Sequence, residues 1–375
     1  MAGYIGGKAV NLSTSGADIS GTANLDIVDV DGAANFAADV TFADGADIIT
    51  ASAGTSNFRA GVNAGNSIAS GGNYNVVVGD EAGTAITTSD YNVAVGYNAG
   101  TSVTTGKENT LIGSLAGDAL TDADFNIAIG WGALGADTLG SKSVAIGTGA
   151  LDAQNFTSAT DSFNVAVGHN AGSDVTTGVN NTLIGSLAGD ALTEGGNNTA
   201  LGINALGADT LGSRNTAIGY QTLLVQNFTS ATNSYNVAIG HDAGRAVTTG
   251  TNNTLIGGLA GDAITTGGSN VALGTSALSA NTTASSNTAV GYQAAYSITG
   301  SQANTAIGRG ALYSHTTGNG ANVALGYDSS RSLTTGAYNV SVGTNALYNN
   351  TTSNYNTAMG RQAAYSNTTG EQNLA

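Results

Sequence analysis

The sequence predicts an all-β solenoid in which each coil takes about 17 residues. An Asn–x–x–x–Gly motif recurs eighteen times at nearly constant spacing, and such self-similarity is typical of a repeat architecture. The 375 residues include 56 glycines and no proline, although roughly nineteen prolines are expected at typical usage. Because proline lacks an N–H group and interrupts backbone hydrogen-bond ladders, its absence suits one long continuous ladder.

The glycine that closes each motif marks the repeat. Steps between these glycines are 17 residues, with two steps of 18 and two of 21, and only Ser143 replaces the leading asparagine. The closing glycines are Gly61, Gly79, Gly96, Gly113, Gly130, Gly147, Gly168, Gly185, Gly202, Gly219, Gly240, Gly257, Gly274, Gly291, Gly308, Gly326, Gly343 and Gly360. The pattern of steps also repeats after 72 residues, and the two long steps carry nearly identical inserts at 153–162 and 225–234. We interpret the inserts as products of a duplication, and we expect them to bulge outward.

Each motif predicts a short strand with two unlike faces. In "NVAIG" (236–240), Val237 and Ile239 share one side of the strand, and Asn236, Ala238 and Gly240 share the other. We expect the large side to fill the interior of its own coil and the small side to admit a close neighbour. The predicted roll core consists of Val93, Val95, Val165, Val167, Val237, Ile239, Val271 and Leu273.

The remainder of each period predicts a tight turn at the glycine, a short second strand and a polar corner, often Thr-Thr-Gly. One such coil buries too few large side chains to offset the entropy of ordering its backbone. Stacking of many coils, together with packing of several chains side by side, is therefore expected, and the protein should be an obligate oligomer.

Three runs carry a resemblance to a known family: "NVAVGYNAG" (92–100), "NTAIGYQTL" (215–223) and "NTAVGYQAA" (287–295). They resemble the Hep/Hag-type head repeats of trimeric autotransporter adhesins and the related repeats of bacteriophage tail fibres. The resemblance covers roughly 57–375 and implies a left-handed parallel β-roll, with three chains side by side in a homotrimeric fibre. The turn of 17 residues is longer than is usual in that family, which leaves the width of the roll open.

Residues 1–56 lie outside the repeat and predict a separate N-terminal β segment. The stretch 25–48 alternates apolar and acidic residues and contains Asp-Gly turn signals. The opening "MAGYIGGKAVNL" is similar to the start of fibre proteins of marine phages, which implies a virion-attachment end. At the other end, Asn373 opens a nineteenth copy, so we expect the sequence to be part of a longer fibre with a distal tip.

Composition argues against several functional classes. A net charge of −16 disfavours nucleic-acid binding, and no apolar run approaches the length needed for membrane insertion. The first residues do not form a secretory signal peptide, and the absence of cysteine removes disulfides and thiolate metal sites. His169, His241 and His315 are interpreted as exposed polar residues, and Asp29-x-Asp31-Gly as a turn rather than a calcium loop. We therefore expect no catalytic residues, metal or cofactor.

The position after each closing glycine varies most, which indicates exposure. Its aromatic members are the candidate surface contacts, and they either stack on sugars or simply cover the strand edge: Tyr97, Trp131, Tyr220, Tyr292 and Tyr327. Charge is also uneven along the chain, because residues 271–375 hold only two of the 25 acidic residues and three of the nine basic residues. A distal half with little negative charge would approach an anionic cell surface more easily.

These observations favour the shaft of a homotrimeric phage tail fibre, located in the virion. Its N-terminus would join the tail or baseplate, and its distal end would meet a host receptor or glycan. The alternative is the head of a bacterial trimeric surface adhesin, which the missing signal peptide disfavours. A polysaccharide-cleaving tailspike would need paired carboxylates in a groove, and equivalent places of the repeats are nearly free of acids.

Overall fold

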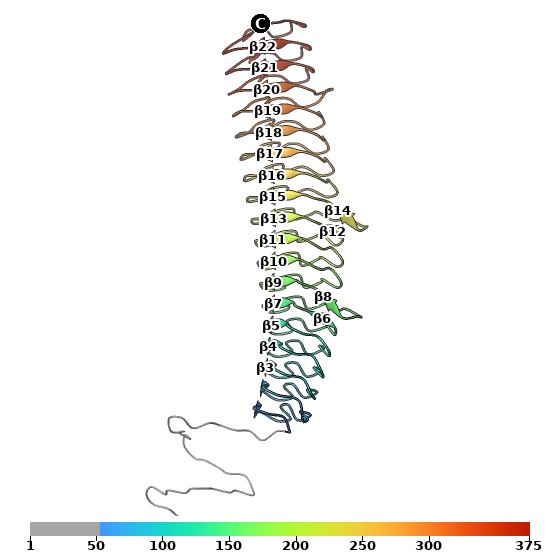
Figure 1. Cartoon of the computed structure of the whole chain (residues 1–375). Coiled ribbons are helices and arrows are strands. Elements are labelled where there is room, and N and C mark those ends of the chain that lie inside the picture. Colours follow the sequence, from blue (N-terminus) through green and yellow to red (C-terminus); the bar gives the residue numbers. More distant parts are fainter. Residues whose placement is uncertain (1–52) are drawn as a thin grey trace, which may run out of the picture. The chain divides into compact units, whose positions relative to one another are not determined.

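The structure, a computed structural model, describes residues 53–375, which form a parallel β-solenoid of about eighteen turns (Figure 1). These residues contain no helix, so the predicted all-β class and the repeat of about 17 residues are confirmed. The predicted N-terminal β segment at 1–56, which includes Asp29 and Asp31, lies outside the described residues except for its last four positions.

Each coil contributes one three-residue strand to a single parallel sheet of eighteen main strands. The main strands are β1 (Phe58–Ala60), β2 (Val76–Val78), β3 (Val93–Val95), β4 (Thr110–Ile112), β5 (Ile127–Ile129), β7 (Val144–Ile146), β9 (Val165–Val167), β10 (Thr182–Ile184), β11 (Thr199–Leu201), β13 (Thr216–Ile218), β15 (Val237–Ile239), β16 (Thr254–Ile256), β17 (Val271–Leu273), β18 (Thr288–Val290), β19 (Thr305–Ile307), β20 (Val323–Leu325), β21 (Val340–Val342) and β22 (Thr357–Met359). Two further pairs of two-residue strands form small parallel sheets at the inserts: β6 (Gly140–Ser141) with β8 (Thr160–Asp161), and β12 (Gly212–Ser213) with β14 (Thr232–Asn233).

Neighbouring main strands pair in register, so equivalent residues of successive coils stack in columns. Between β17 and β18, for example, Val271 pairs with Thr288 and Leu273 with Val290. The amide N–H of Val271 donates to the Asn287 carbonyl at 2.8 Å, and the same bond recurs from coil to coil. Successive coils are therefore joined by a backbone ladder of the kind that proline would interrupt.

The interior of each coil holds the small residue at the centre of the strand, so the predicted roll core is wrong. In β17, Ala272 is fully buried, whereas Val271 and Leu273 are 37% and 43% exposed. The remaining predicted core residues are partly exposed in the same way: Val93, Val95, Val165, Val167, Val237 and Ile239. The alternation was predicted correctly but its faces were reversed, because side chains such as Ile264 and Leu278, from the segment opposite the strand, fill the thin interior.

The leading asparagines form a buried ladder inside the solenoid. The backbone N–H of Asn253 donates to Oδ1 of Asn236 at 2.9 Å, and that of Asn270 donates to Oδ1 of Asn253 at 3.0 Å. The side-chain amide of Asn253 also donates to the Gly267 carbonyl across the coil at 3.0 Å. Each asparagine thus satisfies backbone groups that the strand and the corner would otherwise bury without partners, which explains its recurrence.

The closing glycine is required for two reasons, as Gly257 shows. Its φ of +132° is one that residues with a side chain rarely adopt. A Cβ at this position would also lie 2.7 Å from the carbonyl carbon and oxygen of Gly274 in the next coil. Both constraints recur along the column of closing glycines. A side chain at these positions would therefore prevent neighbouring coils from stacking at about 4.8 Å.

After the closing glycine, the chain forms turns rather than the predicted second strand, which is wrong for the regular coils of residues 53–375. The residue eight positions after each leading asparagine points inward and adopts a left-handed conformation. This residue is leucine in seven coils and glycine or another small residue in the others. Wherever it is leucine, the residue three positions later is polar. The pairs are Leu134/Asp137, Leu151/Gln154, Leu206/Asp209, Leu223/Gln226, Leu278/Asn281, Leu312/His315 and Leu347/Asn350.

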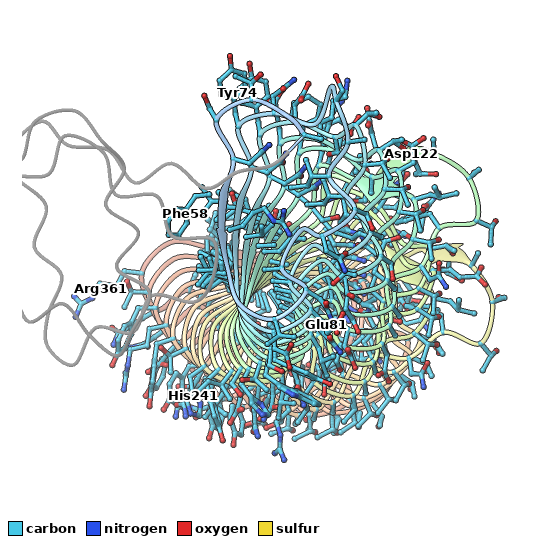
Figure 2. All side chains as sticks on the ribbon, turned by 90° about the horizontal axis from the view of Figure 1, so that it is seen from below. Phe58, Tyr74, Glu81, Asp122, His241 and Arg361 are labelled. Carbon is cyan, nitrogen blue, oxygen red and sulfur yellow. The ribbon has the colours of Figure 1, made fainter. Side chains whose placement is uncertain are left out.

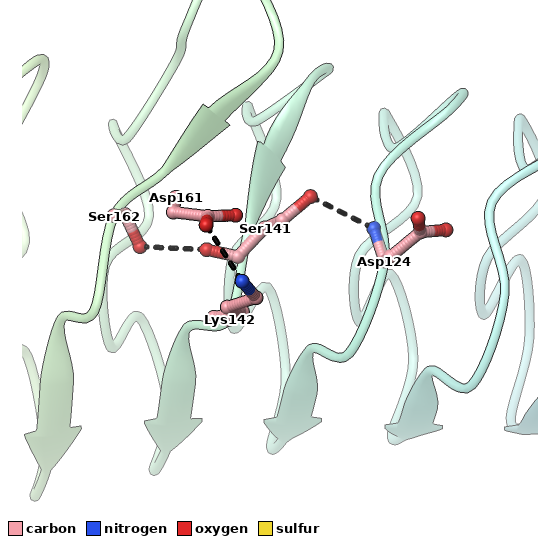
Figure 3. Close-up of polar contacts among 5 residues, drawn as sticks. All are labelled: Asp124, Ser141, Lys142, Asp161 and Ser162. Carbon is pink, nitrogen blue, oxygen red and sulfur yellow. Dashed lines mark hydrogen bonds and ion pairs between the residues drawn. The ribbon is translucent and has the colours of Figure 1, made fainter.

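The inserts leave the regular coil and carry the small extra strands (Figure 1). Lys142 pairs with Asp161 at 2.6 Å, and Ser162 Oγ donates to the Ser141 carbonyl at 3.2 Å (Figure 3). The insert is also anchored inward, because Phe156 is buried and Gln154 donates to buried Asp137 at 2.6 Å. The expected bulge is therefore present, but it has its own buried anchor.

Candidate interaction surface

The outward face of the main sheet is a candidate interaction surface that runs through all eighteen coils of the described solenoid. Every main strand turns its first and third side chains outward, and the third position is valine, isoleucine, leucine or methionine in seventeen of the eighteen strands. Leu325 is 41% exposed, and Ile112, Ile127, Leu201 and Ile307 are exposed as well. Contiguous exposed apolar surface of this extent marks interaction sites in soluble proteins.

All five predicted surface contacts are exposed: Tyr97, Trp131, Tyr220, Tyr292 and Tyr327. They share a column beside the third strand position, and three of them contact other residues of that column. Tyr220 stacks on His241 with ring centroids 5.1 Å apart. Arg309 lies over both Tyr292 and Tyr327, at 5.9 and 5.2 Å from the ring centroids. Exposure is confirmed, while binding through these rings stays a prediction.

A second aromatic column on the other side of the sheet was missed. It occupies the position before the leading asparagine, where the backbone is left-handed with φ near +60°. An aromatic residue stands at this position in seven of the eighteen coils. Tyr74 stacks on Tyr91 at 5.0 Å, and Tyr338 stacks on Tyr355 at 5.2 Å. Tyr74 points outward at the rim when the solenoid is viewed along its length, as His241 does at another place on the rim (Figure 2). Aromatic letters at this fixed offset could have revealed the column.

A third ladder lies in the turn segments near the C-terminal end. Tyr296 stacks on Tyr313 at 5.2 Å, Arg331 lies 4.6 Å from the Tyr313 ring centroid, and Tyr348 stacks on Tyr365 at 5.3 Å. In coils closer to the N-terminus the same column holds carboxylates, among them Asp118, Asp152, Asp190 and Asp262. Their desolvation raises the pKa of these carboxyl groups above the usual range for aspartate.

Two titratable side chains, His315 and Asp209, are buried in the coil corners. His315 was expected to be exposed but is fully buried, and its Nε2 lies 2.7 Å from Ser301 Oγ. Burial lowers the pKa of His315 to about 4, so its ring is neutral at neutral pH. Asp209 is buried beside Gln226, which donates to it at 2.6 Å, and desolvation raises the pKa of this carboxyl group. Each group has a polar partner inside its coil corner, Ser301 for His315 and Gln226 for Asp209.

Residues 53–375 contain no group of three histidine or acidic side chains arranged to hold a metal ion. Within the same range there is no helix of the length and apolarity that a membrane span requires.

Comparison of the chain with protein-family models, curated proteins and solved structures finds no match.

Proposed function

We propose that this chain is the shaft of a homotrimeric phage tail fibre, which positions a host-recognition tip and contacts the host surface along its flank. The observation that carries the proposal is the outward face of the main sheet, where aliphatic side chains such as Leu273 and Leu325 are exposed. These side chains are already more than half buried in the single chain, so completing their burial contributes only part of the about 1.5–3 kcal/mol of a fully exposed side chain of this size. Repeated along eighteen strands, this is a strong drive for lengthwise association.

A shaft needs stiffness rather than turnover, and the described solenoid supplies it. Backbone hydrogen bonds and the asparagine ladder join each coil to the next at about 4.8 Å per coil. About seventeen intervals then give a rod on the order of 80 Å for this part of the fibre. We assign no catalytic step and no cofactor to it, and we place it in the virion with its N-terminus toward the tail or baseplate.

Immunogold labelling of purified virions tests the assignment. Antibodies against residues 57–375 should decorate the tail fibres of the phage that encodes the chain. Decoration of a bacterial envelope, with virions unlabelled, would reject the phage assignment and favour the head of a trimeric surface adhesin.

A further inference from the structure

The flank of the solenoid contains a shallow depression that differs from its neighbours. Its volume is about 470 Å³, and it is lined by Leu115, Asp118, Trp131, Gly132, Gly135, Ala136, Asp152 and Ala153. These residues come from the turn segments of three successive coils and none belongs to a main strand. The depression therefore does not use the outward face of the sheet, which the proposed trimer would cover.

Two carboxylates converge over a bare glycine at the centre of this depression. A point where a Cβ would stand on Gly135 lies 3.0 Å from Asp152 Oδ1 and 3.6 Å from Asp118 Oδ1. Gly135 does not have the positive φ of the closing glycines, so its backbone does not require glycine. The main effect of the missing side chain is to leave the floor of the depression open. Neither carboxylate forms an ion pair within residues 53–375, and ionised carboxylates accept hydrogen bonds only.

Trp131 supplies an apolar surface beside these acceptors. Its side chain is 57% exposed, and the equivalent residues of the adjacent coils are the small Ser114 and Thr148. The tyrosines of the ladders cover one another's faces, whereas no aromatic or cationic partner stacks on Trp131 in the described solenoid. An indole face next to two acceptors suits a ligand with one apolar face and an edge of donors.

We propose that Trp131, Asp118 and Asp152 bind a neutral pyranose ring. The C–H face of the sugar stacks on the indole, and its hydroxyl groups donate to the two carboxylates. Acceptor-only groups disfavour anionic sugars, and a single exposed aromatic contributes only about 0.5–1 kcal/mol to binding of a cation. The site itself does not require a trimer, but its use as a host contact rests on the proposed function.

The 72-residue duplication provides a matched control within the chain. In the second copy, Ile203 replaces Trp131 and Leu224 replaces Asp152, while Asp190 and Gly207 are kept. The backbone geometry is preserved, because a Cβ on Gly207 would lie 3.4 Å from Leu224 Cδ1 and 3.5 Å from Asp190 Oδ1. Trp131→Ile and Asp152→Leu therefore introduce side chains that the equivalent coils of the second copy already accommodate.

Tryptophan fluorescence of the chain of residues 1–375 tests the site, because Trp131 is the only tryptophan among them. Methyl α-glucoside, methyl α-mannoside and N-acetylglucosamine serve as pyranose probes, glycerol as the control polyol and choline as the cationic probe. We expect a saturable change with at least one pyranose, with a Kd on the order of 1 mM. Asp152→Leu should weaken binding at least tenfold, and Asp190→Asn in the second copy should leave it unchanged.

Calorimetry with the same pyranose provides a second readout. Trp131→Ile should abolish the heat of binding, and the graft Ile203→Trp with Leu224→Asp should raise the stoichiometry from one site per chain to two. No saturation by any pyranose, unchanged affinity in Asp152→Leu, or saturation by choline alone would overturn the proposal. Light scattering on the same samples separates the two proposals: a monomer that binds sugar contradicts the fibre, and a trimer that does not bind contradicts the site.

Discussion

The asparagine and glycine columns show how single residues set the repeat. Asn253 accepts from the next coil and donates across its own, so each asparagine serves three hydrogen bonds at once. Where Ser143 interrupts the column, Ser162 Oγ lies 2.6 Å from Ser143 Oγ and accepts from the Asn164 N–H at 3.4 Å. The insert thus supplies the acceptor that the missing asparagine would have provided, which gives it a structural role besides its origin in a duplication.

His315 predicts acid sensitivity. Its folded pKa of about 4 lies below its ordinary value of 6.5, so between these pH values the unfolded chain binds a proton that the folded chain does not. The contribution of neutral His315 to the free energy of unfolding is fully present above about pH 6.5. It is lost as the pH falls toward 4 and amounts to about 3 kcal/mol in total.

His315→Asn should remove that part of the pH dependence, because asparagine occupies the same place in the coils with Leu278 and Leu347. Urea unfolding at neutral and mildly acidic pH measures the effect, with His169→Asn at an exposed position as the control. An equal loss of stability with acid in His315→Asn and in the parent chain would contradict the assignment.

At the scale of the coil, two interior positions three residues apart share one space, so a large side chain at one goes with a smaller side chain at the other. Leu278 is buried in a left-handed conformation, and Asn281 three residues later uses Oδ1 to accept from the Ala284 N–H at 3.0 Å. The next coil fills the same space with Ala295 and Ile298, which are both buried. Leucine at the first place and a β-branched residue at the second would overfill the interior.

This exchange predicts a strongly coupled double mutant. Leu278→Ala alone leaves a cavity and should cost about 2–5 kcal/mol, while Asn281→Ile alone overpacks against Leu278. The double variant reproduces the pair of the following coil and should be less destabilised than the sum, by about 0.5–3 kcal/mol. Chemical unfolding of all four chains completes the cycle, and strict additivity would show that the two positions do not share space.

The sequence was sufficient to predict the strands but not to assign their faces. Period and alternation placed β3 and β15 within the correct residues, because spacing of the asparagine and glycine is visible in the letters. Which face is inside depends on what the opposite wall supplies, and that wall was wrongly expected to be a second strand. Left-handed turns place Leu278 and Ile264 inside, so the strand contributes Ala272 instead. The depression at Trp131 needed residues from three coils, and only the folded register brings Asp118 and Asp152 together.

At the scale of the whole molecule, the proposed trimer should cover the outward face of the main sheet. Cysteine labelling can test this cleanly, because the chain has no native cysteine. Leu273→Cys lies on the outward face, and Thr283→Cys lies at an exposed corner of the same coil. Slow labelling at 273 with rapid labelling at 283 is expected in the native assembly, and equal rates would indicate that the face is open to solvent.

The most direct measurement is the mass of the native chain by light scattering coupled to size-exclusion chromatography. The proposed trimer should have a mass of about 110 kDa, three times the chain mass of 36.6 kDa. Leu273→Asp with Leu325→Asp should reduce that mass, because both place a charge on the face that the proposed trimer covers, whereas Thr283→Asp should not. A parent chain that runs as a folded monomer of 36.6 kDa would contradict the proposed trimer and, with it, the fibre shaft.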